Sequence, residues 1–346
     1  MCKKKLAEIL NGDYKHTYII AEIGVNHNGR MDLAFKSIDA AIESGADAVK
    51  FQFYKVENFV SKNAEQAKYQ TENTGIYESQ FEMLKRFELT SKDQEILINY
   101  CLHRNIDFLA TPFDAETADY LYEMGVKAFK IGSGDLTNIP LIKKIDEKGL
   151  PIILSTGMAN LGEIEEALDH IKYSKAALLH CTSEYPAPYE DVNLKAIVKM
   201  GEVFNRTVGY SDHTIGCEAS IGAVALGARM IEKHFTLDKN LAGPDHKASM
   251  DPKEFKQFVS FIRNIEKCMG DGIKKCMPSE TYTKKAARKS LVIDKDMNNG
   301  ETITMDNLSI KRPGDGIPPK YFDLLIGKTV KRDIKKDTIL TWDDVL

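Results

Sequence analysis

The stretch YIIAEIGVNHNG, residues 18–29, opens a pattern that repeats along most of the chain. An apolar run of strand length ends in polar residues and a glycine turn, and a segment with helical spacing follows, as in residues 33–42. The strand-like runs are residues 18–23, 48–53, 106–110, 128–131, 151–154, 176–180, 208–210 and 230–234. This alternation predicts parallel strands covered by helices.

Two architectures accommodate such an alternation. Eight strand–helix units within about 250 residues fit a closed (β/α)8 (TIM) barrel, and a doubly wound open sheet is the runner-up. Polar residues follow the strands throughout the sequence, whereas a doubly wound sheet concentrates them at one switch point. We therefore expect an α/β fold with a TIM barrel.

Composition bounds the rest of the interpretation. With 346 residues, 43% hydrophobic and 28% charged, the chain predicts one large and one smaller soluble domain. Residues 1–14 lack the apolar core of a leader, and no run of about 18 apolar residues occurs, which favours the cytoplasm over a membrane. The net charge of -4 gives no general attraction to nucleic acid. Six cysteines without a Cys-x-x-Cys pair indicate neither a zinc knuckle nor a disulfide framework.

The polar residues at the ends of the predicted strands should converge on one mouth of the barrel. They include Glu22, Lys50, Gln52, Thr111, Lys130, Ser133, Asp135, Ser155, Ser183 and Tyr185. Two lysines, several hydroxyls and glycine-rich turns suit a small phosphorylated acid. The structural alternative is that the lysines extend along the barrel wall and the glycines only permit tight corners.

Two histidines follow neighbouring strand-like runs, His213 in YSDHT (210–214) and His234 in IEKHFT (231–236). Neutral imidazoles at one rim of a parallel sheet are suitable ligands for a divalent metal. Ser211, Asp212 and Asp245 lie close in sequence and could orient a ring or a ligand. The alternative is that both are surface or hydrogen-bonded core histidines, as most are in a chain of this length.

The character of the chain changes near Pro278. After a lysine-rich segment, residues 296–308 are echoed by residues 333–345, each read as strand, polar turn, strand and acidic turn, which predicts a small pseudo-symmetric β module. Between them, the stiff loop KRPGDGIP (311–318) either is an exposed connection or presents Arg312 to a ligand. We divide the chain into a barrel (1–270), a linker (271–288) and a carboxy-terminal domain (289–346).

These segments resemble the bacterial sialic acid synthase family. The match is carried in order by AEIGVNHNG (21–29), KIGSG (130–134), LSTGM (154–158), LHCTSEYP (179–186), YSDHT (210–214), EKHFT (232–236) and GPDHK (243–247). The tail with KRPG (311–314) is similar to the family's antifreeze-like (SAF, β-clip) domain. The resemblance implies a transferase that condenses phosphoenolpyruvate, an N-acylated mannose-type sugar and water into a nine-carbon 2-keto acid and phosphate.

It also implies roles for individual residues. Mn²⁺ or Mg²⁺ is bound by His213 and His234. The chemistry of the condensation, rather than the resemblance, makes Glu22 the candidate for handling the proton of the attacking water; the alternative is a carboxylate that hydrogen-bonds a sugar hydroxyl. Phosphoenolpyruvate is held by Lys50, Thr111, Lys130, Ser133, Ser155, Ser183 and Ser211. The sugar lies near Glu22, Gln52, Asp135, Tyr185 and Asp245. Arg312 contacts the acyl group from the other chain of a domain-swapped homodimer.

Two departures from the family concern the identity of the sugar. Asp135 stands where some members have Glu, and Ser183 stands where some have Asn. The first hypothesis is an N-acetylneuraminate synthase that uses N-acetylmannosamine. The alternative is an N,N'-diacetyllegionaminate synthase that uses 2,4-diacetamido-2,4,6-trideoxymannose. A third, from another class, is a non-catalytic sugar- or phosphate-binding barrel.

Overall fold

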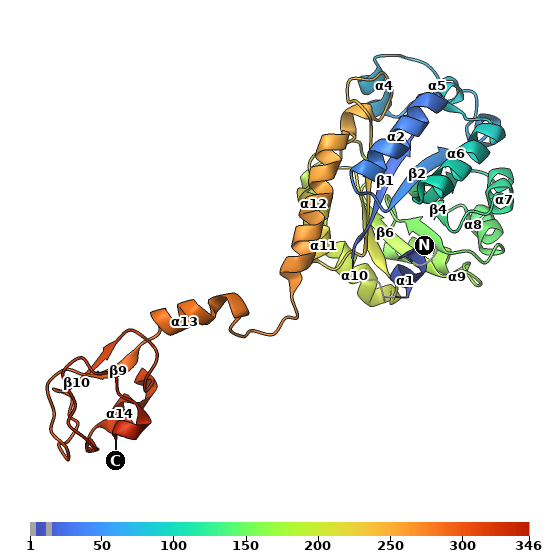
Figure 1. Cartoon of the computed structure of the whole chain (residues 1–346). Coiled ribbons are helices and arrows are strands. Elements are labelled where there is room, and N and C mark those ends of the chain that lie inside the picture. Colours follow the sequence, from blue (N-terminus) through green and yellow to red (C-terminus); the bar gives the residue numbers. More distant parts are fainter. Residues whose placement is uncertain (1–4, 12–15, 346) are drawn as a thin grey trace. The chain divides into compact units, whose positions relative to one another are not determined.

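The computed structural model describes residues 5–11 and 16–345, and the chain forms two compact units, residues 1–270 and 271–346. The first unit contains eight parallel strands (Figure 1): β1 (Tyr18–Gly24), β2 (Ala48–Phe53), β3 (Asp107–Pro112), β4 (Phe129–Ile131), β5 (Ile152–Ser155), β6 (Ala176–Cys181), β7 (Val208–Asp212) and β8 (Met230–His234). Their order is β3-β2-β1-β8-β7-β6-β5-β4, and β3 and β4 also lie in contact. The predicted barrel is therefore confirmed, and the doubly wound sheet is wrong.

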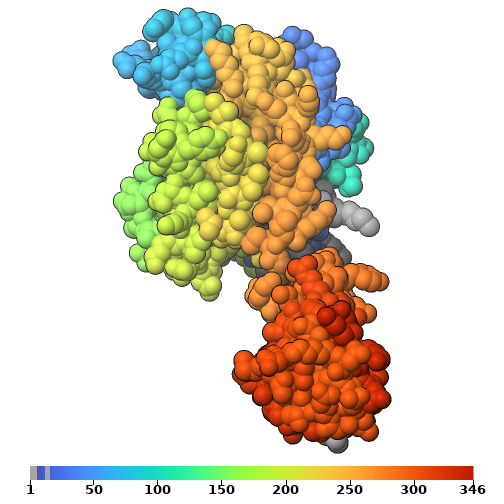
Figure 2. Space-filling view, turned by 90° about the vertical axis from the view of Figure 1, so that its left-hand side faces the viewer, coloured from blue at the N-terminus to red at the C-terminus, as the bar shows by residue number. Residues whose placement is uncertain are grey.

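The α-helices of this unit in the described residues are α1 (Lys5–Leu10), α2 (Met31–Glu43), α3 (Val56–Phe59), α4 (Lys68–Thr74), α5 (Gln80–Phe87), α6 (Ser91–Arg104), α7 (Ala115–Glu123), α8 (Ile139–Asp146), α9 (Leu161–Asp169), α10 (Lys195–Phe204), α11 (Glu218–Ala225) and α12 (Pro252–Met269). Sequence sets their ends, as at α12, where Asp251 accepts a hydrogen bond from the Glu254 amide. The apolar stripe of α12 faces the barrel, and Figure 2 shows α11 and α12 packed side by side on its outside.

The barrel interior has two layers that follow from the two-residue period of a strand. The apolar layer, near the amino ends of the strands, consists of Tyr18, Ile20, Ala48, Leu109, Ala128, Ile153, Ala177, Leu179 and Met230. Leu6 and Ile9 of α1 pack against it. At residue 209 a Cβ would lie 2.5 Å from the Met230 carbonyl oxygen, which explains why the interior requires glycine there. This layer is the packed base on which the rest of the interior stands.

The second unit has its own apolar core, which includes Leu291, Ile303 and Leu340. Its regular strands are β9 (Ser290–Ile293) and β10 (Leu308–Lys311), an antiparallel pair, and its helices are α13 (Thr281–Ala287) and α14 (Phe322–Leu325). The predicted hairpin within each sequence repeat is wrong. A bridge between Met297 and Ile334 joins the two repeats, because their apolar positions complete one shared core rather than two separate ones.

No helix in the described parts of the chain is long and apolar enough to cross a bilayer. Residues 1–4 and 12–15, which belong to the amino-terminal segment considered above for a leader, lie outside the described residues, and so does Cys2. The other five cysteines are free thiols.

Candidate active site

The polar layer of the barrel interior begins two residues after the apolar layer on most strands. Glu22 follows Ile20, Lys50 follows Ala48, and Lys130 follows Ala128. Because alternate residues of a strand face the same side, these side chains enter the barrel above its apolar base. The sequence thus places charged groups in a buried position where they must find partners among themselves.

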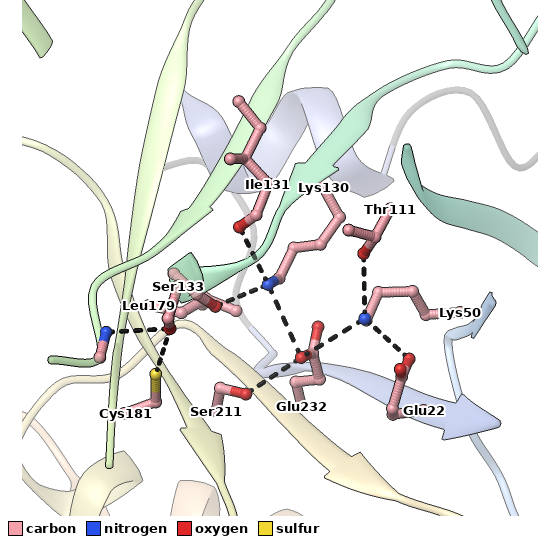
Figure 3. Close-up of polar contacts among 12 residues, drawn as sticks. Glu22, Lys50, Thr111, Lys130, Ile131, Ser133, Leu179, Cys181, Ser211 and Glu232 are labelled. Atoms are coloured by element: carbon pink, nitrogen blue, oxygen red, sulfur yellow. Dashed lines mark hydrogen bonds and ion pairs between the residues drawn. The ribbon is translucent and has the colours of Figure 1, made fainter. Parts of the chain in front are cut away.

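Two lysines and two carboxylates form the centre of this layer (Figure 3). Lys50 Nζ lies 2.9 Å from Glu22 Oε2 and 3.8 Å from Glu232 Oε1. Lys130 Nζ lies 3.8 Å from the same oxygen of Glu232, so that this carboxylate stands between the two ammonium groups. Glu232 also accepts a hydrogen bond of 3.0 Å from Ser211 Oγ, and Lys50 donates one of 3.2 Å to Thr111 Oγ1.

The two carboxylates differ in their affinity for a proton. Burial raises the pKa of Glu22 to about 7; the Lys50 ammonium lowers it only in part, and the nearby charge of Glu232 raises it further. Burial would also raise the pKa of Glu232, but the ammonium groups of Lys130 and Lys50 outweigh burial and hold it below its usual value. Near neutral pH, therefore, Glu232 is the permanent counter-charge of the lysines and Glu22 can exchange a proton.

The lysines differ in the same way. The carboxylates of Glu22 and Glu232 outweigh burial and raise the pKa of Lys50, whereas burial prevails at Lys130 and lowers its pKa. Lys130 Nζ donates hydrogen bonds to Ser155 Oγ (2.6 Å) and to the Ile131 carbonyl oxygen (3.3 Å). An incoming anion would relieve the cost of burying both ammonium groups.

A cradle of small groups lies beside Lys130 and Ser155. The Gly157 amide donates to Ser133 Oγ (3.0 Å), which also contacts Cys181 Sγ (3.0 Å). At residue 157 a Cβ would lie 2.3 Å from Ser183 Oγ and 2.8 Å from Ser133 Oγ. Glycine is therefore required for the Ser133 and Ser183 hydroxyls to lie this close to residue 157, and such a group of hydroxyls is suited to the oxygens of a phosphate or carboxylate.

His213 and His234 lie together above this layer, with ring centroids 5.7 Å apart. Burial lowers the pKa of His213 to about 4 and that of His234 well below its usual value, the latter reinforced by His213, so both rings are neutral. His213 Nδ1 lies 2.7 Å from the Thr182 carbonyl oxygen, which fixes Nδ1 as the donor and leaves the Nε2 lone pair available. His234 Nδ1 is buried without a hydrogen-bond partner.

These features fit a divalent cation. Such an ion binds the lone pair of a neutral imidazole nitrogen, and that lone pair must not already accept a strong hydrogen bond. Among the described residues, no group of three or more His, Cys, Asp and Glu side chains is arranged to hold a metal. The two imidazoles would thus be its main protein ligands and would leave coordination positions open for water or substrate.

Tyr185 and Asp245 complete the predicted group at the mouth. The Tyr185 ring lies 4.1 Å from the His213 ring and 5.5 Å from the His234 ring, between centroids. Asp245 is buried with Oδ1 unpartnered, and burial raises its pKa to about 6. Gln52 joins them from β2 by donating a 3.2 Å hydrogen bond to Glu22 Oε1. An unpartnered buried carboxylate oxygen beside aromatic rings is suited to a sugar hydroxyl.

Two predicted residues lie apart from these contacts. Asp135 is half-buried after β4 and accepts a hydrogen bond from Asn138 (2.9 Å), while burial raises its pKa. Arg312 belongs to the second unit, where it is exposed and its Nε donates to the Ala287 carbonyl oxygen (3.1 Å). Its contact with a sugar remains a prediction.

Sequence reasoning missed two residues of the site. Glu232 stands two positions before His234 on β8, so the strand period alone would have placed both side chains inside the barrel. Tyr69 of α4 packs on Tyr185 with ring centroids 5.0 Å apart. No local sequence pattern around Tyr69 could place it there. The position of α4 over the mouth depends on hydrogen bonds of Asn73 with Pro244 and Lys247, which are far away in the sequence.

Together, fold and site define a (β/α)8-barrel protein whose strand ends bring two buried ammonium groups beside a pair of imidazoles. Residues 37–274 match the NeuB family and residues 288–346 match the SAF domain. The chain therefore belongs to the NeuB family, and the resemblance drawn from its sequence motifs is confirmed.

The relatives and a solved structure agree with this assignment. The chain is 51% identical to the N,N'-diacetyllegionaminic acid synthase of Campylobacter jejuni, over 94% of this chain and 99% of that protein. It is 44% identical to the protein of the same name from Legionella pneumophila, over 95% of this chain and 94% of that one. The crystal structure of N-acetylneuraminic acid synthetase from Leptospira borgpetersenii in complex with citrate shares 37% identity and a TM-score of 0.68, covering 78% of this chain and 90% of that one. The family is thus one of sialic acid and related nonulosonate synthases.

Proposed function

We propose that this protein is an N,N'-diacetyllegionaminate synthase. It would condense phosphoenolpyruvate, water and 2,4-diacetamido-2,4,6-trideoxymannose into N,N'-diacetyllegionaminate and phosphate. The observation that carries the choice of sugar is the 51% identity to the Campylobacter jejuni synthase of that name over nearly the whole of both chains. This favours the alternative hypothesis from the sequence over the first one, N-acetylneuraminate synthesis from N-acetylmannosamine.

The buried lysines support phosphoenolpyruvate as the first substrate. Its phosphate and carboxylate would be held by Lys50 and Lys130, with hydrogen bonds from Ser133, Ser155, Ser183, Ser211 and Thr111. Such a set places two ammonium groups and several hydroxyls around one small anion in a water-poor site, where each interaction is strong. A phosphate held in line loses little freedom during the reaction.

The acceptor sugar would lie at the mouth, beside Gln52, Asp135, Tyr185 and Asp245. A divalent cation, Mn²⁺ or Mg²⁺, held by His213 and His234 would supply Lewis-acid polarisation of the sugar's aldehyde oxygen. Carbon three of phosphoenolpyruvate then forms the new bond to the aldehyde carbon, and carbon two gains positive character. Tyr185 packs against both imidazole rings and would restrict the aldehyde to one orientation.

Water attacks carbon two, and its proton needs an acceptor. Glu22 is suited to this role because its pKa of about 7 lets it gain and lose a proton near neutral pH, and Gln52 and Lys50 fix its carboxylate. Phosphate then leaves with cleavage of its bond to carbon two, and the hydroxyl on that carbon becomes the keto oxygen as its proton goes to the departing phosphate. The proton taken up by Glu22 balances the former aldehyde oxygen, which becomes a hydroxyl, and the 2-keto acid remains. Lys50 and Lys130 would stabilise the departing dianion.

The test is phosphate release from phosphoenolpyruvate with each candidate sugar, with and without Mn²⁺. We expect release that requires both Mn²⁺ and the diacetamido sugar, with much slower release for N-acetylmannosamine. Faster turnover of N-acetylmannosamine would establish the first hypothesis instead. Binding of sugar and phosphoenolpyruvate without any turnover would favour a non-catalytic barrel.

We further propose a cytoplasmic, domain-swapped homodimer in which Arg312 of the partner subunit contacts the sugar's acyl group. Arg312 is exposed on a Gly/Pro-rich loop, and only its Nε is hydrogen-bonded, to the Ala287 carbonyl oxygen, which supports a contact of its guanidinium with another chain. Arg312→Ala should raise the sugar KM by about tenfold, the value of one charged hydrogen bond, with the phosphoenolpyruvate KM little changed. At sugar concentrations far below KM, mixing inactive His213→Ala protein with Arg312→Ala protein should give more activity than Arg312→Ala alone, because the mixed dimer has one intact site. No gain on mixing would exclude the swapped arrangement.

A further inference from the structure

A second pair of charged residues is buried behind the two histidines, on the outer face of the barrel wall. Asp212 of β7 and Lys233 of β8 are register partners in adjacent strands, and Lys233 Nζ lies 3.1 Å from Asp212 Oδ2. Their side chains are 0% and 1% exposed. Ser220 of α11 covers the pair and donates a 2.6 Å hydrogen bond to Asp212 Oδ2. This ion pair takes no part in the anion site, since it faces the helices.

The position of the pair along the strands is informative. Ser211 and Glu232 point inward and contact each other, Asp212 and Lys233 point outward, and His213 and His234 again meet inside. Along the strands, the ion pair therefore lies between two sets of inward-facing side chains, Ser211 and Glu232 on one side and the two imidazoles on the other. It joins the two strands at the point from which both histidines project.

The hydrogen bonds of the pair bracket His213. Asp212 Oδ1 accepts from the amide and the hydroxyl of Thr214, at 2.9 and 2.7 Å, and Lys233 Nζ donates to the Thr214 carbonyl oxygen at 2.6 Å. The residues before and after His213 are thus fixed to the residue before His234. With the Thr182 carbonyl orienting the His213 ring, the backbone positions of both imidazoles are determined relative to each other.

Stability alone is a poor reason to bury this pair. A buried ion pair gains little over an apolar pair of similar volume, because desolvation of both charges offsets their attraction. Groups that orient metal-binding residues, in contrast, typically change metal affinity by about 10- to 100-fold when altered. The pair is also neutral as a whole, so its effect on a cation at the histidines is geometric rather than electrostatic.

We propose that the Asp212–Lys233 ion pair is a positioning device that sets the spacing of the His213 and His234 imidazoles for one divalent cation. This rests on the proposed function only in that both histidines are taken as ligands of the cation. Asp212 and Lys233 are positioning residues that touch neither substrate nor metal.

The experiment compares Lys233→Met, Asp212→Asn and the double variant Asp212→Asn/Lys233→Met. Each single variant leaves one buried group unpaired and should lower the melting temperature, whereas the double variant removes both charges and should recover most of it. A cavity of about 220 Å³ borders Lys233, so that methionine can be accommodated there. Manganese affinity is measured by electron paramagnetic resonance of free Mn²⁺, well below the melting temperature.

We expect the double variant to remain folded but to bind Mn²⁺ about 10- to 100-fold more weakly than the wild type. Asp47→Asn is the control, because the buried Asp47 forms another ion pair, 2.9 Å from the half-buried Arg263, at the amino ends of the strands. It should lower the melting temperature without changing Mn²⁺ affinity. Wild-type affinity in the folded double variant would overturn this inference alone, whereas absence of Mn²⁺ binding in the wild type would overturn the histidine assignment and the inference together.

Discussion

The two layers inside the barrel use the same strand period for opposite purposes. Ile20, Ala128 and Ile153 fill the base with apolar side chains, and two residues further along the same strands Glu22, Lys130 and Ser155 form the polar layer. The base gains free energy by burial, while the polar layer spends part of that gain on desolvated charges. Stability and chemistry are therefore separated along each strand. Substitutions in the apolar layer should lower the melting temperature and spare turnover, and substitutions in the polar layer should do the reverse.

The largest effect on turnover should come from the histidines. His213→Ala or His234→Ala would remove a ligand of the cation and slow metal-dependent condensation by about three orders of magnitude, since polarisation of the aldehyde is worth several kcal/mol. The fold should persist, as judged by circular dichroism, because the imidazoles stand above the packed base. Full activity of either variant in chelator-treated buffer would remove that histidine from the site.

Next in size is the anion site. Lys130→Met should lower kcat/KM for phosphoenolpyruvate by about 100- to 1000-fold, because a preorganised charge facing the dianion is lost. Its melting temperature should stay close to that of the wild type, since burial already disfavours the Lys130 charge. The exposed Lys143→Met on α8 is the control and should leave both quantities unchanged. If Lys130→Met and Lys143→Met had the same kcat/KM for phosphoenolpyruvate, Lys130 would not take part in binding this substrate.

Glu22 should produce a smaller effect together with a change in pH dependence. Its raised pKa of about 7 means that it is protonated below neutrality, so a base at this position requires kcat/KM to rise with pH through about 7. Glu22→Gln should remove this rise and slow turnover by about 100-fold. Asp245→Asn should retain the rise, because burial raises the pKa of Asp245 only to about 6. An unchanged pH profile in Glu22→Gln would show that another group handles the proton.

The apolar base should have the smallest effect on turnover. Ile153→Ala deletes fully buried methyl groups and should cost about 2–5 kcal/mol of folding free energy. Below its melting temperature, kcat should remain within about twofold of the wild type, since no polar contact of the site involves this side chain. A large fall in kcat with an unchanged melting temperature would contradict the separation of the two layers.

Much of this arrangement could be predicted because it depends on local patterns. The eight apolar runs gave the barrel, and residues at strand ends such as Lys50 and His213 were found because parallel strands bring their carboxyl ends to one rim. Glu232 was missed because it lies inside a run that was read as apolar. Tyr69 could not be found, since its place over Tyr185 depends on contacts between segments far apart in sequence. The two sequence repeats of the second unit suggested a strand–turn–strand within each repeat. In the structure one repeat pairs with the other, which a local pattern does not reveal.

The central claim is that His213 and His234 hold one cation beside the lysine-lined cradle. The most direct measurement is a crystal structure of protein soaked with Mn²⁺ and phosphoenolpyruvate, with anomalous scattering recorded for manganese. We expect one anomalous peak at bonding distance from a nitrogen of each imidazole, with the phosphate against Lys50, Lys130 and Ser133. Well-ordered phosphoenolpyruvate with no peak at the histidines, or with manganese bound elsewhere, would contradict it.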